Sequence, residues 1–195
     1  MCYPAISTKP MRGDERIRDA NGVPVASIAS YWVWAHSNLM DNTERGAYAE
    51  YLVRLAVGTN APVRNQWDAF DIETPEGIRI EVKTSGYIQS WAQERPSAIR
   101  FSIRPARGWN GATGTYAATA LRQSDVYVFC LLANADQSTV DPLDLSQWNF
   151  YVLPTKDLNL KLGSQKTISL SGILRLGARM VAFGELRKTI LEAVK

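Results

Sequence analysis

Residues 67–85 read WDAFDIETPEGIRIEVKTS, and this stretch predicts a β-hairpin. From residue 78 to residue 83, apolar and polar side chains alternate strictly, which indicates a strand with one buried face. We expect its partner strand to run from residue 67 to residue 72. Residues 74–77, Thr-Pro-Glu-Gly, have turn chemistry because proline fixes φ and glycine accepts positive φ.

The length of the turn decides which acidic residue faces the second strand. A three-residue loop at 75–77 places Asp71 opposite Glu81 and keeps the apolar side chains of both strands on the core face. A four-residue loop places Asp68 opposite Lys83, but it turns apolar residues of the first strand to the polar face. A β-bulge would rescue Asp68. We therefore favour Asp71 and keep Asp68 as the alternative.

The polar face of this hairpin has the side chains that a metal site requires. Glu81 and Lys83 are two residues apart, so they project to the same side of the strand. Two carboxylates about 5 Å apart across a ladder repel each other unless a cation lies between them. Oxygen ligands without nearby histidine or cysteine suit Mg²⁺ or Mn²⁺, and an adjacent ammonium group can orient water. The alternative interpretation is a surface hairpin with a cross-strand ion pair.

These motifs resemble those of the PD-(D/E)XK nuclease superfamily, which has the restriction-endonuclease-like fold. Asp71 (or Asp68) and the sequence Glu81-Val82-Lys83 stand where that superfamily has its acidic residue and its E-x-K motif. Residues 46–50, Gly-Ala-Tyr-Ala-Glu, match its helix with a glutamate, Glu50. Residues 87–93, expected to form a short helix, match its glutamine-containing helix. The resemblance covers residues 43–93, and it departs from the family pattern because no proline precedes the aspartate.

The resemblance implies an α/β fold with a central mixed β-sheet flanked by helices on both faces. It also implies a divalent-metal-dependent nuclease that hydrolyses phosphodiester bonds, most plainly in DNA. Asp71, Glu81, the Val82 carbonyl and Glu50 would hold Mg²⁺ (or Mn²⁺), and Lys83 would position or activate water. The residues expected to contact nucleic acid are Gln89, Gln93, Arg100, Arg104 and Arg107.

Two other functions remain open from the sequence. One is a catalytically inactive scaffold of this fold that binds nucleic acid or a protein partner. The other is a restriction-type enzyme with strict sequence choice, which would form a homodimer through an aromatic helix at residues 27–40. The aromatic residues of that helix are expected to be core or subunit-contact residues.

The rest of the chain predicts one domain at residues 27–195 that follows a loosely ordered arm at residues 1–26. A second helix is expected at residues 44–57, with a buried stripe of Tyr48, Tyr51, Leu52 and Leu55. Further strands are expected at 99–104, 125–133 and 148–153, a loop at 105–116 and a terminal helix at 180–195. The run at 125–133 is apolar on both faces, so we expect a central strand.

Composition excludes several classes of protein. The chain has 195 residues, a net charge of +3 and a pI near 8.9, which is compatible with a phosphate-bearing partner. Its two cysteines, Cys2 and Cys130, give no disulfide framework and no zinc-ligand spacing. No stretch resembles a membrane span or a signal peptide, so we expect a cytoplasmic protein.

Overall fold

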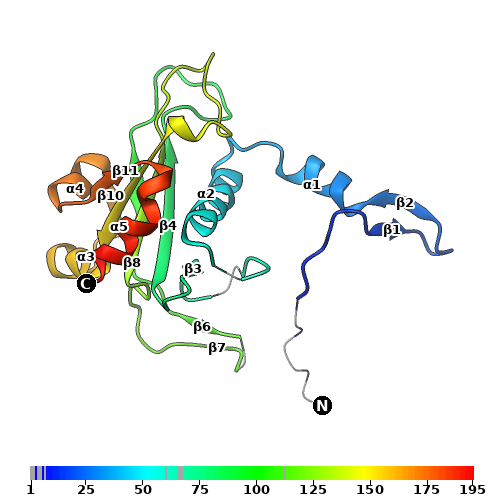
Figure 1. Ribbon diagram of the computed structural model, residues 1–195, viewed down its shortest axis with the longest axis horizontal. Coiled ribbons are helices and arrows are strands. Elements are labelled where there is room, and N and C mark those ends of the chain that lie inside the picture. The colour runs from blue at the N-terminus through cyan, green and yellow to red at the C-terminus, as the bar shows by residue number, and fades with distance from the viewer. Residues whose placement is uncertain (1–2, 4–5, 7, 60, 66–67, 112) are drawn as a thin grey trace.

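A five-stranded mixed β-sheet forms the centre of the protein (Figure 1). The computed structural model describes residues 3, 6, 8–59, 61–65, 68–111 and 113–195. Across the sheet the strands are β11 (Arg179–Val181), β9 (Trp148–Pro154), β8 (Val126–Leu132), β4 (Arg79–Gly86) and β3 (Ile72–Glu73). The predicted α/β fold with a central mixed sheet is thus confirmed.

Strands β4 and β8 pair in parallel, and this pairing is the middle of the sheet. The register runs from Ile80 opposite Val126 to Gly86 opposite Leu132. All residues of β8 are buried, which confirms the predicted central strand. At the start of both strands, the Arg79 guanidinium forms an ion pair with Asp125 at 2.8 Å.

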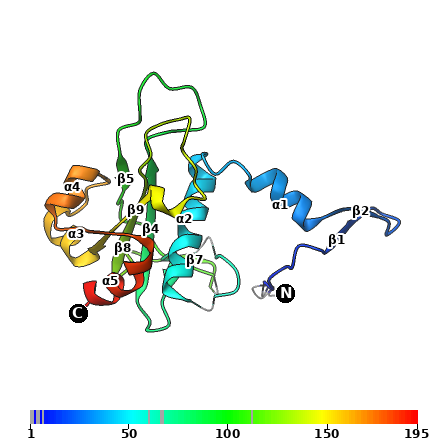
Figure 2. The ribbon, with the colours of Figure 1, turned by 45° about the horizontal axis from the view of Figure 1, so that its top comes forward.

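Both faces of the sheet are covered by helices. One face packs against α2 (Asn42–Val57) and α5 (Leu186–Ala193), which contribute Leu52, Val53 and Ile190 to a shared core. The other face packs against α3 (Thr155–Leu162), α4 (Leu170–Arg175) and the small antiparallel sheet of β5 (Arg100–Ser102) and β10 (Thr167–Ser169). Figure 2 shows α3 and α4 on the side of the sheet away from α2.

The hairpin has the predicted register. The Thr74 amide donates to the Ile78 carbonyl at 2.9 Å, so the loop contains three residues, and Gly77 has a positive φ of 83°. The first strand is shorter than predicted, because β3 contains only two residues and residues 68–71 form a bend. Trp67, expected in that strand, lies outside the described residues.

Helix α2 begins and ends as the sequence predicts, but it is rotated about its axis. The Asp41 side chain caps its first turn, and Gly58 ends it in the left-handed conformation. The predicted stripe is wrong at Tyr51 and Leu55, which are 50% and 48% exposed. Leu52 is buried as predicted, and the other buried apolar residues of the helix are Ala49, Val53 and Val57, whose small side chains let it approach the strands closely.

An extension projects from the body of the protein (Figures 1 and 2). It consists of the hairpin β1 (Arg16–Arg18) and β2 (Pro24–Ser27), followed by α1 (Ile28–His36). Helix α1 has no buried residue, and Trp34 is 83% exposed. The expectation that these aromatic residues form the core is therefore wrong, whereas their role in a subunit contact stays a prediction.

The C-terminal third contains more regular structure than the sequence predicts. Residues 163–172 include β10 and the start of α4, and the terminal helix α5 is preceded by β11 and a short 3₁₀ helix. Two short strands, β6 (Trp109–Asn110) and β7 (Thr115–Tyr116), form a small hairpin within the predicted 105–116 loop. Among the described residues, no helix combines the length and the apolar character needed to cross a membrane.

Arg122 joins the segment after β5 to α3 and to the loop that follows it. This buried guanidinium donates to the Ile103 carbonyl, the Asn159 side chain and the Gly163 carbonyl at 2.8 Å, and to the Gln165 carbonyl at 3.0 Å. One side chain therefore satisfies four acceptors from three parts of the chain. It fixes the segment that leads to Arg104 and Arg107.

We expect Arg122→Met to lower the free energy of unfolding by about 3 kcal/mol, because four acceptors, one of them buried, lose their charged donor. Urea denaturation followed by circular dichroism measures this change. Arg100→Met is the matched control, since Arg100 is exposed and its loss should change stability by less than about 0.5 kcal/mol. Equal urea midpoints for Arg122→Met and Arg100→Met would contradict the structural role of Arg122.

Candidate active site

The hairpin brings Asp71 beside the E-x-K motif of β4. Asp71 lies one residue before β3, and its amide donates at 3.0 Å to the carbonyl of Ile80, the residue that pairs with Ile72. Its carboxylate Oδ2 accepts a hydrogen bond from the Val82 amide at 2.7 Å. Asp71 is therefore held against the backbone of the E-x-K motif itself.

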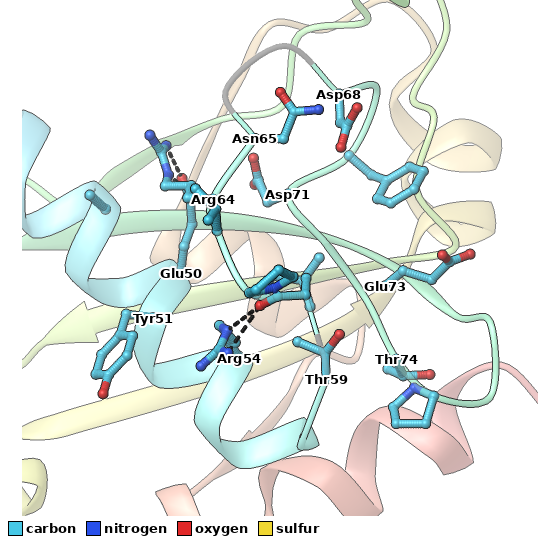
Figure 3. Close-up of a pocket in the computed structure, with 17 residues that line it drawn as sticks. Glu50, Tyr51, Arg54, Thr59, Arg64, Asn65, Asp68, Asp71, Glu73 and Thr74 are labelled. Atoms are coloured by element: carbon cyan, nitrogen blue, oxygen red, sulfur yellow. Dashed lines mark hydrogen bonds and ion pairs between the residues drawn. The ribbon is translucent and has the colours of Figure 1, made fainter. Parts of the chain in front are cut away.

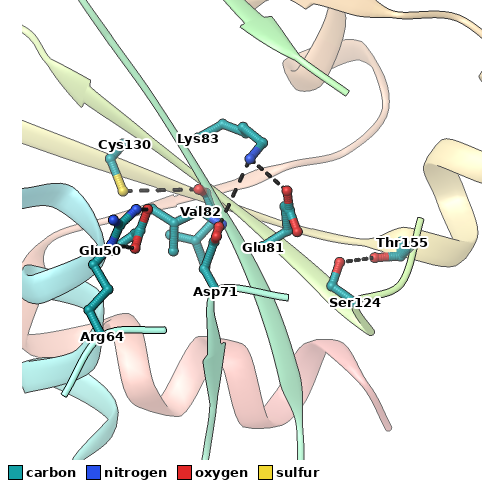
Figure 4. A network of polar contacts seen from close by, with 10 residues as sticks. Glu50, Arg64, Asp71, Glu81, Val82, Lys83, Ser124, Cys130 and Thr155 are labelled. Carbon is teal, nitrogen blue, oxygen red and sulfur yellow. Dashed lines mark hydrogen bonds and ion pairs between the residues drawn. The ribbon is translucent and has the colours of Figure 1, made fainter. Parts of the chain in front are cut away.

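Lys83 lies between the two carboxylates (Figure 4). Its Nζ is 2.6 Å from Glu81 Oε1 and 3.9 Å from Asp71 Oδ2. All three side chains are partly buried, with exposed fractions of 27% for Lys83, 20% for Glu81 and 24% for Asp71. The structure thus brings together the three residues that form the core of the predicted site.

Burial and charge shift the pKa of two of these groups. Burial is the largest cause of the raised pKa of Glu81; Lys83 opposes it, and the Asp71 carboxylate adds to it. For Lys83, burial acts to lower the pKa, but the carboxylates of Glu81 and Asp71 outweigh it and hold the pKa above its ordinary value. Lys83 is therefore a cation at neutral pH, suited to orienting a water and offsetting negative charge rather than to accepting a proton.

Glu50 reaches the same region from α2, where it pairs with Arg64 (Figure 3). The Arg64 guanidinium binds both carboxylate oxygens, with Nη2 at 2.7 Å from Oε1. Burial raises the pKa of Glu50, Arg64 counteracts this, and the Asp71 carboxylate raises it further. Glu50 is therefore a partly buried acid within the electrostatic reach of the Asp71 carboxylate.

Arg54, one helical turn after Glu50 on α2, binds the loop that follows the helix. Its guanidinium donates twice to the Ala61 carbonyl, at 3.1 and 3.0 Å. Arg54 thereby holds the loop after α2 against the helix, and this loop presents Arg64 to Glu50. No local sequence pattern indicates the Glu50–Arg64 pair, because it joins a helix to an irregular loop.

Asp71 lies where two cavities meet. The larger, here called the Glu50 cavity, has a volume of about 630 Å³ and is lined by Glu50, Arg64, Asp68 and Asp71 among others. The smaller, here called the Trp109 cavity, has a volume of about 210 Å³, and its lining includes Asp68, Asp71, Glu81 and Trp109. Asp68 is exposed and lies on the rim common to both.

The three predicted arginines differ in their relation to the site. Arg104 and Arg107 are exposed and line the Trp109 cavity beside Asp71 and Glu81. The Arg107 Nε also donates to the Ala117 carbonyl at 2.5 Å, which fixes its position. Arg100 is exposed on β5 but lines neither cavity.

Gln89 and Gln93 are in a turn-rich loop instead of the predicted helix at 87–93, which is wrong. Gln89 is 8% exposed; it accepts hydrogen bonds from Arg45 and donates to the Gly86 carbonyl at 2.8 Å. The Gln93 side chain accepts from the Gln89 amide at 2.7 Å and donates to Ser97 at 2.9 Å. Both amides hold the loop after β4, and neither lines the two cavities.

The donor chemistry fits Mg²⁺, although the described residues form no ready-made metal cage. Within the part of the chain that the structure describes, no three histidine, cysteine, aspartate or glutamate side chains come together to hold a metal ion. Mg²⁺, however, is usually bound through one or two carboxylates, with waters and substrate phosphates as the other ligands. Asp71 and Glu81 are two such donors. Since the amide and carbonyl of a strand residue face the same neighbour, the Val82 carbonyl points to the edge where Asp71 lies.

The sequence of this chain matches the profile of one known protein family. The profile of the bacteriophage T4 endonuclease IV family matches residues 30–172, most of the chain and every candidate site residue. No curated protein matches the chain. The chain therefore belongs to the bacteriophage T4 endonuclease IV family, which is a family of nucleases.

Proposed function

We propose that this chain is a divalent-metal-dependent nuclease that hydrolyses phosphodiester bonds in DNA, with a site of the PD-(D/E)XK type. The observation that carries the proposal is the convergence of Asp71, Glu81 and Lys83 on one face of the hairpin, with Lys83 3.9 Å or less from both acids. The family supports the nuclease activity. We propose in addition that the substrate is DNA, that the reaction needs a divalent metal and that the site is of the PD-(D/E)XK type.

Asp71 and Glu81 would hold the metal, with the Val82 carbonyl as a third oxygen donor. Bound there, Mg²⁺ would polarise a phosphoryl oxygen and neutralise charge on the phosphate. Glu50, a partly buried acid that lines the same cavity as Asp71, would bind a second ion or a water of its hydration shell. Burial raises the pKa of Glu50, and the ion pair with Arg64 opposes that rise and so favours the anionic form that a cation ligand needs.

Lys83 would hold the attacking water in line with the scissile bond. Because neighbouring carboxylates raise its pKa, it acts as a positioned cation that offsets the negative charge developing on the phosphate. Water adds to the phosphorus, the bond to the leaving sugar oxygen breaks, and a proton from the water ends on that oxygen. Arg104 and Arg107 lie beside the acids, where they would contact backbone phosphates.

Asp71→Asn tests the charge of Asp71 without removing its hydrogen bond, because the amide oxygen can still accept from Val82. We expect this variant and Lys83→Met to lower kcat by about 100-fold or more, since each removes an electrostatic contact to the transition state. The assay is cleavage of linear, circular, single-stranded and branched DNA, with RNA in parallel, together with thermal melting to verify folding.

Glu94→Gln is the matched control for these variants. Glu94 is an exposed carboxylate of the loop after β4 that lines neither cavity, so its loss should leave cleavage unchanged. Wild-type rates in folded Asp71→Asn or Lys83→Met would defeat the proposed site. A folded wild-type protein that binds DNA and never cleaves it would instead favour the inactive scaffold.

Removal of the metal should abolish cleavage reversibly. We expect EDTA to stop the reaction and added Mg²⁺ or Mn²⁺ to restore it, because hydrolysis here depends on a cation between the two acids. Titration calorimetry with Mn²⁺ gives a readout that does not require activity: wild type should bind, and a Glu81→Gln, Asp71→Asn double variant should bind at least about 10-fold more weakly. Cleavage that continues in EDTA would refute the metal requirement.

A further inference from the structure

The Trp109 cavity has an aromatic wall beside the candidate catalytic acids. The small hairpin of β6 and β7 brings Trp109 and Tyr116 together, with ring centroids 4.8 Å apart and planes tilted by 58°. Both residues line the cavity that Asp71 and Glu81 also line. Tyr116 is 54% exposed, so part of its ring is available to a ligand.

The walls of this cavity combine flat aromatic, amide and cationic groups. The Gln123 side chain lines it, and its amide nitrogen makes a 3.4 Å hydrogen bond to the Ala106 carbonyl. Gly108 is tightly enclosed: a Cβ there would lie 3.3 Å from the Gln123 amide nitrogen and 3.5 Å from the Ala69 Cβ. Arg104 and Arg107 complete the opening. A side chain at residue 108 would therefore crowd the space between Ala69 and the Gln123 amide, and glycine leaves this space open.

The size of the cavity selects a small planar group. Its volume of about 210 Å³ is below the roughly 300–1,000 Å³ of pockets for drug-sized ligands. Aromatic side chains stack on any base because every base has a π-face, and glutamine amides hydrogen-bond base edges. Arginines at the opening match the phosphates on either side of such a base. One unpaired nucleobase satisfies all three kinds of lining group.

We propose that the Trp109 cavity binds one unstacked nucleobase of the substrate, adjacent to the phosphate that is cleaved. Trp109 and Tyr116 form the stacking surface, and Gln123 lies at the base edge. These residues are then specificity-determining: they select which nucleotide stands next to the cut. This inference rests on the proposed nuclease function, and it adds a base-reading site to it.

The kinetic test compares Trp109→Ala and Tyr116→Ala with Trp91→Ala. Trp91 is also a partly exposed tryptophan, 52% exposed, but it does not line the cavity. Loss of one stacking contact should raise KM by about 5- to 150-fold, leave kcat within about 2-fold and broaden the distribution of cut positions in a mixed-sequence oligonucleotide. Trp91→Ala should match wild type. Cavity variants with wild-type KM and cut positions would overturn the proposal.

A binding test separates this inference from the proposed catalysis. The Asp71→Asn protein, which retains the cavity, is titrated with an intact oligonucleotide and with a series of oligonucleotides that each lack one base. The abasic position moves by one nucleotide from one member of the series to the next. One abasic position should weaken binding at least 5-fold, and Trp109→Ala in the same background should remove that difference. If wild type never cleaves but the difference persists, only the catalytic proposal fails. If cleavage is normal and no abasic position weakens binding, the base site fails.

Discussion

The alternation of side chains along β4 is the constraint on which the site depends. Ile80 and Val82 are buried in the core that α2 and α5 cover, whereas Glu81 and Lys83 project from the opposite side of the strand. Strands β3 and β8 pair with β4 on both sides, so the strand cannot slide alone. A shift by one residue would exchange the two faces, placing charges in the core and apolar groups at the site. The same contacts that stabilise the sheet therefore fix the positions of the charged groups.

The carboxylates around Asp71 are held close together at an electrostatic cost that two cations reduce. Burial raises the pKa values of both Glu50 and Glu81, and the negative charge of Asp71 raises both further. Lys83 compensates on the hairpin, and Arg64 compensates at α2. Pairing explains how these acids are tolerated in a folded protein. It does not by itself explain why three acids and a lysine gather around the end of one short hairpin, since an ordinary surface ion pair needs only two partners.

Local chemistry made the hairpin predictable from sequence, and long-range packing made other parts unpredictable. Thr74 to Gly77 encode a turn, and only one register puts all apolar residues on one face, which identified Asp71. The rotation of α2 depends on which side chains fit against the sheet, and size misled the prediction: Tyr51 is large and apolar yet exposed, while Ala49 is fully buried. Residues 87–93 have no helix because the amides of Gln89 and Gln93 are used to hold a loop. Arg64 and Arg122 act on segments distant in sequence, so no local pattern identifies them.

The position of Asp71 constrains how a substrate strand could lie. Asp71 is a common wall of the Glu50 cavity and the Trp109 cavity. Under the proposed function, a phosphate held at Asp71 and Glu81 has one flanking nucleotide toward each cavity. The two cavities are unlike: the Glu50 cavity is lined by an ion pair and a helix face, whereas the Trp109 cavity is lined by three aromatic side chains and three arginines. A strand that crosses this edge therefore meets different chemistry on its two sides, which would fix its polarity relative to Lys83. Because in-line attack requires the water and the leaving oxygen on opposite sides of the phosphorus, a fixed polarity also decides which of the two ester bonds breaks.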